Sequence, residues 1–215
     1  GHPLQDLVAA ETPDQNTANN PQAPGRIISL LPGSRKGELK MLLSIFIESA
    51  KHIRAALPDT TFAVIKAPTI PYQVYEDRLK GINIPIRIVE KNAYDAIRKS
   101  ALAIVCSGTA TLECALLGTP MIISNRGSLL TYLVAKAVIR VKHLGLPNLI
   151  LGEKKFPELL QYEATPANIA ASAVSILGNA KRYQEMKEAC KETSRRIGEK
   201  GASARAADEV LALLT

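Results

Sequence analysis

Short apolar runs alternate along this chain with longer segments in which apolar residues recur every three or four positions. The short runs, which are typical of buried parallel strands, lie at residues 27–31, 61–66, 86–89, 102–106 and 121–124. Helical spacing is clearest after the first run, at Leu39, Leu42, Leu43, Phe46, Ile47 and Ala50. Strands that alternate with helices in this way predict an α/β fold built on a doubly wound parallel sheet.

The rest of the pattern predicts where the domain begins and how it ends. Further helices are predicted at residues 72–79, 93–99, 109–117 and 129–138, followed by an irregular stretch that carries Pro147 and Asn148. From residue 166 the pattern is helical only, with trailing helices predicted at 168–177, 180–197 and 202–214. Residues 7–25 are polar and rich in Asn, Gln, Thr and Pro, which is typical of a linker. We therefore expect a linker over residues 1–25 and one domain over residues 26–215.

The turn after the run at 102–106 has the composition of an anion site. Its sequence is Ser107-Gly108-Thr109-Ala110-Thr111-Leu112-Glu113. Ser107 or Thr109 can cap the following helix, and Gly108 lets another group approach the backbone. A helix N-terminus with free amides favours a phosphate, and Glu113, about one turn further on, could accept hydrogen bonds from two ribose hydroxyls. The alternative is an ordinary strand-to-helix turn with an exposed glutamate.

A second loop of this kind follows the run at 27–31, with the sequence Pro32-Gly33-Ser34-Arg35. Pro-Gly predicts a turn, and Ser34 can cap the long helix that follows. Arg35 offers a planar fork that suits a diphosphate, although it could also be an ordinary solvated arginine. A cation beside the positive end of a helix is poorly placed unless an anion joins it. In an open α/β sheet, these two loops would converge on one crevice.

The net charge and the composition limit the classes of partner and cofactor that we expect for this chain. The net charge of +7 comes from basic residues scattered over helices, without a nucleic-acid module, so we expect no nucleic-acid partner. No apolar segment approaches the roughly 18 residues that cross a bilayer, and no basic-then-apolar leader is present. Cys106, Cys114 and Cys190 are expected to be core thiols. His2, His52 and His143 lack metal-ligand spacing, so no metal and no cofactor are expected.

Five motifs, in order and at similar spacing, resemble the lipid-A-disaccharide synthase family. They are Leu30-Leu31-Pro32-Gly33-Ser34-Arg35 followed by Glu38, the Ser107–Glu113 run, Pro120-Met121-Ile122-Ile123, Leu146-Pro147-Asn148 and Glu158-Leu159-Leu160-Gln161. The resemblance covers nearly everything from Arg26 onward, and Gly1-His2-Pro3-Leu4 also resembles the segment that closes the family's N-terminal half. It implies the Rossmann-like, C-terminal half of an inverting glycosyltransferase of the GT-B type, which has two such domains.

The activity that the resemblance implies is transfer of 2,3-diacylglucosamine from UDP to 2,3-diacylglucosamine 1-phosphate, which forms the lipid A disaccharide. The donor-binding residues would be those of the two loops, joined by two amides that lie beyond the last predicted strand, Asn148 and Gln161. From the residues alone, Asn148 belongs to a turn and Gln161 is an exposed amide. Arg35 would stabilise the departing UDP, and the uracil would lie near residues 89–92. No Asp-x-Asp motif is present, so no divalent cation is expected.

One departure from the family is large, because this chain starts where the family's N-terminal half should be ending. The resemblance places the acceptor site, the membrane-contacting surface and the catalytic base in that half, so the isolated chain is expected to be inactive. The chain would be a piece of a longer protein or half of a split one. The expected location is the cytoplasmic side of the inner membrane of a Gram-negative-type bacterium, with peripheral contact.

Three alternatives stay open at this point. The same half-fold could serve another UDP-sugar transferase, a UDP-sugar epimerase, or a nucleotide-binding module without chemistry. A nicotinamide dehydrogenase is not favoured, because no G-x-G-x-x-G follows the first strand. A homodimer formed by exchange of the helices from Asn168 onward is one further option.

Overall fold

The computed structural model describes residues 2–11, 25–127 and 143–212. In these residues, six strands form one sheet in the order β3-β2-β1-β4-β5-β6. They are β1 (Ile27–Leu31), β2 (Thr61–Ile65), β3 (Ile86–Val89), β4 (Leu102–Cys106), β5 (Met121–Asn125) and β6 (Glu158–Leu160). Every neighbouring pair is parallel, so the predicted doubly wound α/β fold is confirmed.

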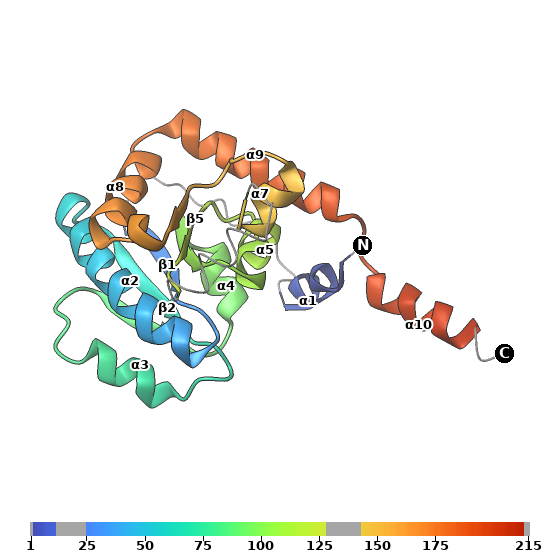
Figure 1. Ribbon diagram of the computed structural model, residues 1–215, viewed down its shortest axis with the longest axis horizontal. Coiled ribbons are helices and arrows are strands. Elements are labelled where there is room, and N and C mark those ends of the chain that lie inside the picture. Colours follow the sequence, from blue (N-terminus) through green and yellow to red (C-terminus); the bar gives the residue numbers. More distant parts are fainter. Residues whose placement is uncertain (1, 12–24, 128–142, 213–215) are drawn as a thin grey trace.

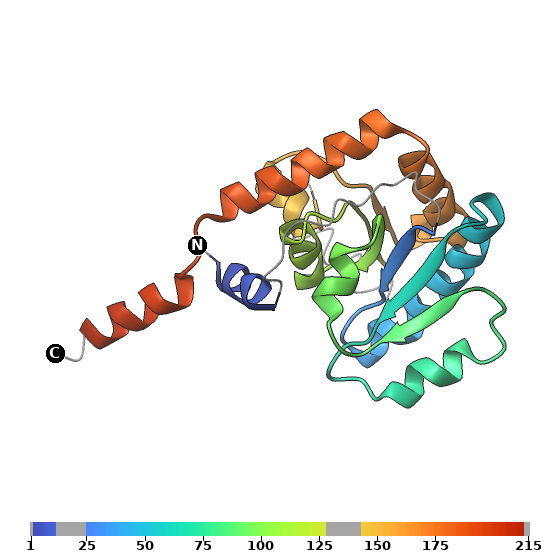
Figure 2. The same ribbon diagram turned by 180° about the vertical axis from the view of Figure 1, so that it is seen from behind.

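The described helices cover both faces of this sheet (Figures 1 and 2). They are α1 (Pro3–Glu11), α2 (Lys36–Ala56), α3 (Tyr72–Leu79), α4 (Ala93–Arg98), α5 (Thr109–Leu116), α7 (Leu146–Leu151), α8 (Pro166–Leu177), α9 (Ala180–Ile197) and α10 (Ala202–Ala212). On one face α2 packs against α8, and on the other α5 packs against α4, α7 and α9. Helix α10 extends away from the domain and contacts α1 (Figure 1).

The two central strands explain why the sheet forms where the apolar runs predict it. All five residues of β4 are buried, and β1 is buried from Ile28 to Leu31. Their polar exception is Ser29, whose hydroxyl lies 2.6 Å from that of Ser100 in the core. Because each buried hydroxyl has the other as a partner, the core holds both without an unsatisfied polar group at this point.

Three predictions about elements need correction or fall outside the described residues. Residues 3–11, part of the linker predicted over residues 1–25, form α1, where Leu4 and Val8 are buried four residues apart on one face. The stretch around Pro147, predicted as irregular, is the short helix α7, and the three-residue strand β6 was not predicted. The predicted helix at 129–138 and residues 12–24 of the linker lie outside the described part of the chain.

Candidate functional site

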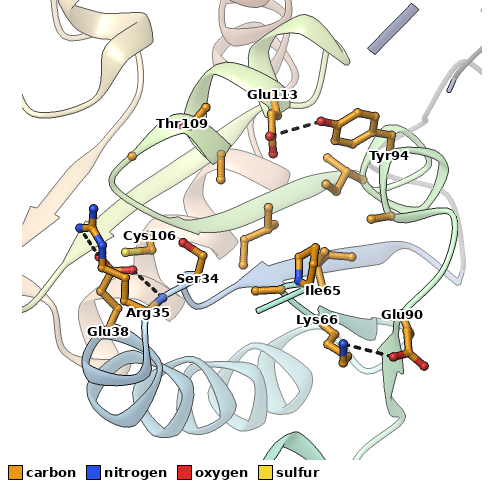
Figure 3. Close-up of a pocket in the computed structure, with 18 of the residues that line it drawn as sticks. Ser34, Arg35, Glu38, Ile65, Lys66, Glu90, Tyr94, Cys106, Thr109 and Glu113 are labelled. Atoms are coloured by element: carbon orange, nitrogen blue, oxygen red, sulfur yellow. Dashed lines mark hydrogen bonds and ion pairs between the residues drawn. The ribbon is translucent and has the colours of Figure 1, made fainter. Parts of the chain in front are cut away.

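An open cavity of about 540 Å³ lies at the carboxyl ends of β1, β2, β3 and β4 (Figure 3). Strand β1 pairs with both β2 and β4, and the chain order reverses between β1 and β4. In open α/β sheets this reversal opens a crevice that is the usual place for a ligand. The cavity therefore lies where the two loops were expected to converge.

Seven of the nine predicted binding residues line this cavity. They are Gly33, Ser34, Arg35, Ser107, Gly108, Thr109 and Glu113. The structure thus brings together two loops that are more than seventy positions apart in the sequence. Their grouping is confirmed, whereas their roles toward a ligand stay predictions.

The loop after β1 depends on Gly33 and Glu38. Gly33 has a φ of 110°, and a Cβ at this position would lie 2.7 Å from Oε2 of Glu38. Arg35 is the N-cap residue of α2, and its backbone N–H donates to Oε2 of Glu38 over 3.3 Å. The prediction that Ser34 caps this helix is therefore wrong. The turn extends one residue further, so that Arg35 is the N-cap, and the Glu38 carboxylate accepts the hydrogen bond from the N-cap amide.

Arg35 is held weakly in this arrangement. Its Nη1 lies 3.2 Å from Oε1 of Glu38, while 84% of the Arg35 side chain is exposed. An exposed ion pair of this kind contributes at most about 1 kcal/mol, so the guanidinium can exchange Glu38 for a stronger anion. Glu38 was not among the predicted site residues, although its place three residues after the N-cap was a usable signal.

The loop after β4 brings the start of α5, which no side chain caps, to the edge of the cavity. Its N-cap is Gly108, which has a φ of 154°, and no side chain caps α5, so the predicted caps Ser107 and Thr109 are wrong. Ser107 is used elsewhere: its hydroxyl donates to the Leu144 carbonyl over 3.1 Å, and its N–H donates to the Ser124 carbonyl over 3.0 Å. The amides of Thr109 and Ala110, in the first helical turn, have no carbonyl one turn back to bind.

Glu113 lines the same cavity, one turn into α5, as predicted. The hydroxyl of Tyr94 donates to Oε1 of Glu113 over 3.3 Å, so a tyrosine in the first turn of α4 orients this carboxylate (Figure 3). Tyr94 was missed because a tyrosine at a helix start has no distinctive pattern. Farther along the cavity, Nζ of Lys66, whose side chain is only 10% exposed, pairs with Glu90 over 3.1 Å.

Asn148 and Gln161 do not line the cavity as the described residues form it. Asn148 is fully buried, where its Nδ2 donates to the Phe156 carbonyl and to Oε1 of Glu158, each over 2.8 Å. Its Oδ1 accepts the N–H groups of Lys155 and Phe156. The amide thus fastens α7 to the start of β6, while Gln161 follows β6 with a φ of 51°. Their part in donor binding stays a prediction.

Cys106 lies at the floor of the cavity but lacks the properties of a nucleophile. Burial, together with the nearby Glu38 carboxylate, raises the pKa of its thiol to about 12. Cys114 and Cys190 are likewise buried and free, which confirms the prediction of core thiols. In the described residues, no group of three or more His, Cys, Asp or Glu side chains could hold a metal ion. Within the same ranges, no helix is both long and apolar enough to cross a membrane.

The sheet order and the crevice define a Rossmann-like domain of the type found in GT-B glycosyltransferases. The model of the lipid-A-disaccharide synthetase family matches residues 1–213, so the chain belongs to that family. It is 36% identical over its whole length to lipid-A-disaccharide synthase of Syntrophus aciditrophicus, of which it covers 57%. It is 38% identical over 87% of its length to that of Myxococcus xanthus, of which it covers 49%. The chain thus spans about half the length of these relatives.

Solved structures share the fold at low sequence identity. A UDP co-structure of S. aureus MnaA aligns with 98% of this chain and 53% of its own, at a TM-score of 0.66 and 13% identity. The spinosyn rhamnosyltransferase SpnG, complexed with spinosyn aglycone, aligns with 91% of this chain and 50% of its own, at a TM-score of 0.61 and 13% identity. These similarities support the fold. They do not identify the ligand, which has to be inferred from the residues of the site.

We expect Asn148→Ala to lower the free energy of unfolding by about 2–4 kcal/mol, because the truncation removes hydrogen bonds to the Phe156 carbonyl, to the Lys155 and Phe156 amides and to the Glu158 carboxylate, most of them buried. Urea unfolding followed by circular dichroism measures this change. Asn168→Ala, at an exposed position of α8, is the matched control and should change stability by about 0.5 kcal/mol or less. Equal, small effects of the two variants would contradict the conclusion that the Asn148 side chain stabilises the contact between α7 and the start of β6.

The raised pKa of Cys106 predicts slow alkylation. With a pKa of about 12, only about one Cys106 thiol in ten thousand is a thiolate at pH 8, and the other two cysteines are buried as well. Iodoacetamide at pH 8, followed by intact-mass measurement, should leave the folded chain unlabelled for hours and should label all three thiols in guanidinium. Rapid single labelling at Cys106 in the folded chain would show that this thiol is exposed and acidic instead.

Proposed function

We propose that this chain is the donor-binding half of a lipid-A-disaccharide synthase, an inverting glycosyltransferase. In this proposal it holds UDP-2,3-diacylglucosamine while the sugar is transferred to 2,3-diacylglucosamine 1-phosphate. The observation that carries the proposal is the cavity at the β1/β4 crevice, with the uncapped start of α5 at its edge. Membership of the lipid-A-disaccharide synthetase family supports the choice of sugar nucleotide.

The proposed donor pose follows from the groups that line the cavity. The diphosphate would accept from the amides of Thr109 and Ala110, where the α5 dipole also favours negative charge. Arg35 would leave Glu38 and join the diphosphate through its fork of donors. The carboxylate of Glu113, already oriented by Tyr94, would accept from the ribose hydroxyls. The uracil would then lie toward Glu90 and Asn92, which line the far part of the cavity.

This arrangement would assist departure of UDP without a metal. Negative charge grows on the diphosphate as the glycosidic bond breaks, and preorganised N–H groups with one guanidinium offset that charge. A catalytic base is not among these groups. Asp77 pairs with Lys80 and Asp95 with Lys99, and neither lines the cavity. We place the base and the acceptor site in the portion of the relatives that this chain does not match.

The same proposal includes the cellular setting. Both substrates carry acyl chains, so the whole protein would work at the cytoplasmic surface of the inner membrane of a Gram-negative-type bacterium. We assign most of that peripheral contact to the portion outside this chain. Close positioning of donor and acceptor between two halves supplies much of the acceleration in such a transfer, so this chain by itself would bind its donor without turnover.

The first ligand prediction is that the chain binds UDP without added metal. Isothermal titration calorimetry in the presence of EDTA should give a measurable affinity for UDP. ADP should bind about tenfold or more weakly, because a purine is larger than the uracil that this part of the cavity is proposed to hold. Added Mg²⁺ should leave the UDP affinity unchanged. Equal and negligible heats for UDP and ADP at millimolar concentration would refute the donor site.

The second prediction separates phosphate from ribose contacts. Arg35→Ala should weaken UDP by about tenfold or more, the effect of losing one charge-assisted contact of about 1.5–3 kcal/mol, and should leave uridine nearly unchanged. Glu113→Ala should weaken UDP and uridine alike, because its partner is the ribose that both ligands share. Calorimetry on the two variants measures the contrast.

Arg87→Ala is the matched control for Arg35→Ala, because Arg87 is an exposed arginine on β3 that does not line the cavity. It should leave UDP affinity as it is. The phosphate assignment fails if Arg35→Ala behaves like Arg87→Ala while both variants keep the fold by circular dichroism.

A further inference from the structure

An ion pair in the main cavity, Lys66 with Glu90, has no assigned role in the proposed donor pose. Lys66 directly follows β2, and Glu90 directly follows β3. These strands pair Ile65 with Val89, and the N–H of Lys66 continues the pairing by donating to the Val89 carbonyl over 2.9 Å. The two charged residues are therefore neighbours at the carboxyl edge of the sheet, where both line the cavity.

The two partners differ in exposure. Nζ of Lys66 lies 3.1 Å from Oε1 of Glu90, and 10% of the Lys66 side chain is exposed against 52% of the Glu90 side chain. A mostly buried ammonium is costly unless it is paired, so Glu90 holds the Lys66 side chain in place. An ammonium has three N–H donors and a carboxylate has two oxygens. In the described part of the chain, this ion pair thus leaves N–H groups of Lys66 and Oε2 of Glu90 for a ligand.

The pair lies at the opposite end of the cavity from the start of α5. In the sheet order, β2 and β3 are two and three strands away from β4, which places them about 10 and about 14 Å from it. Figure 3 shows Arg35 and Thr109 on one side of the cavity and Lys66 and Glu90 on the other. An extended nucleoside diphosphate spans this separation. A diphosphate held at the start of α5 therefore places its base beside the pair.

A cation next to a carboxylate complements the polar edge of uracil. That edge presents an N–H group at position 3 between carbonyl oxygens at positions 2 and 4. A carboxylate opposite position 3 accepts this N–H, and an ammonium on either side of the carboxylate meets a carbonyl oxygen. Cytosine has an unprotonated nitrogen at position 3, so the same carboxylate would face a lone pair. Such a mismatch leaves both acceptors without a donor, which is a penalty against the wrong base.

We propose that Lys66 and Glu90 select uracil over cytosine, Glu90 by accepting from N3–H and Lys66 by donating to an adjacent carbonyl oxygen of the base. The inference rests on the proposed function for the position of the nucleotide, and it adds the residues that choose the base. In that function Glu113 and the α5 amides anchor the ribose and the diphosphate. The base then has little freedom to slide along the pair and exchange its donor and acceptor groups.

The test compares UDP with CDP by calorimetry, because the two ligands share their ribose and diphosphate. The unchanged chain should bind UDP about tenfold or more tightly than CDP. Glu90→Gln offers an N–H donor as well as an acceptor at nearly the same size, so the UDP-to-CDP affinity ratio should fall toward one. Lys66→Met removes the donor and keeps an unbranched apolar side chain, and it should weaken UDP by about tenfold or more.

The matched controls come from an ion pair outside the cavity, Lys51 with Glu48 on α2, whose Nζ and Oε1 lie 2.7 Å apart. Glu48→Gln and Lys51→Met make the same chemical changes and should leave the UDP-to-CDP ratio as it is. Arg35→Ala should weaken UDP and CDP alike, because its proposed partner is the diphosphate. A changed ratio therefore reports on the base and not on the phosphates.

The outcomes separate this inference from the proposed function. Absence of UDP binding by the unchanged chain would refute the donor site and base selection together. UDP binding with equal affinity for CDP, or with the same UDP-to-CDP ratio in folded Glu90→Gln, would overturn base selection alone. Because Glu90 is half-exposed, Glu90→Gln is expected to fold even if Lys66→Met does not, and circular dichroism checks both variants.

Discussion

The parallel pairing of β1 with β4 is the constraint on which the candidate site depends. Residues 28–31 lie beside residues 102–105 in register, so the two strands end together at the same edge of the sheet. Since the chain leaves β1 toward one face and β4 toward the other, α2 and α5 begin on either side of one crevice. The side chains of both strands pack on both faces of the sheet, so a one-residue slip would move each of them to the opposite face and disrupt the packing on both.

The crevice combines donors that are fixed with donors that can move. The amides at the start of α5 are held by the helix and need no rearrangement to meet an anion. Arg35, in contrast, is an exposed side chain bound to Glu38 by an ion pair that water screens. Its position at an N-cap, where a cation is unfavourable, leaves it ready to accept an anionic partner. The fixed α5 amides and the mobile Arg35 side chain together suit a ligand whose negative charge increases during the reaction.

Sequence reasoning predicted the elements that form by burial and failed where short polar contacts decide. The strands β1 to β5 are apolar runs, and their order in an open sheet brings the two loops together. The caps were assigned wrongly, because Ser34 and Ser107 can bind several backbone groups and only the folded chain selects among them. Strand β6 is three residues long and begins with Glu158, whose buried carboxylate accepts from Asn148 and from the Leu144 and Gly145 amides. No local pattern reveals such a network.

The central claim, that a nucleoside diphosphate binds at the β1/β4 crevice, is tested most directly by following backbone amide NMR signals during a titration with UDP. The account predicts that the largest changes cluster at Gly33, Arg35, Gly108, Thr109 and Ala110, while amides of α9 barely shift. A saturating titration whose largest changes lie around α7 and α9, with the two loops unaffected, would contradict it.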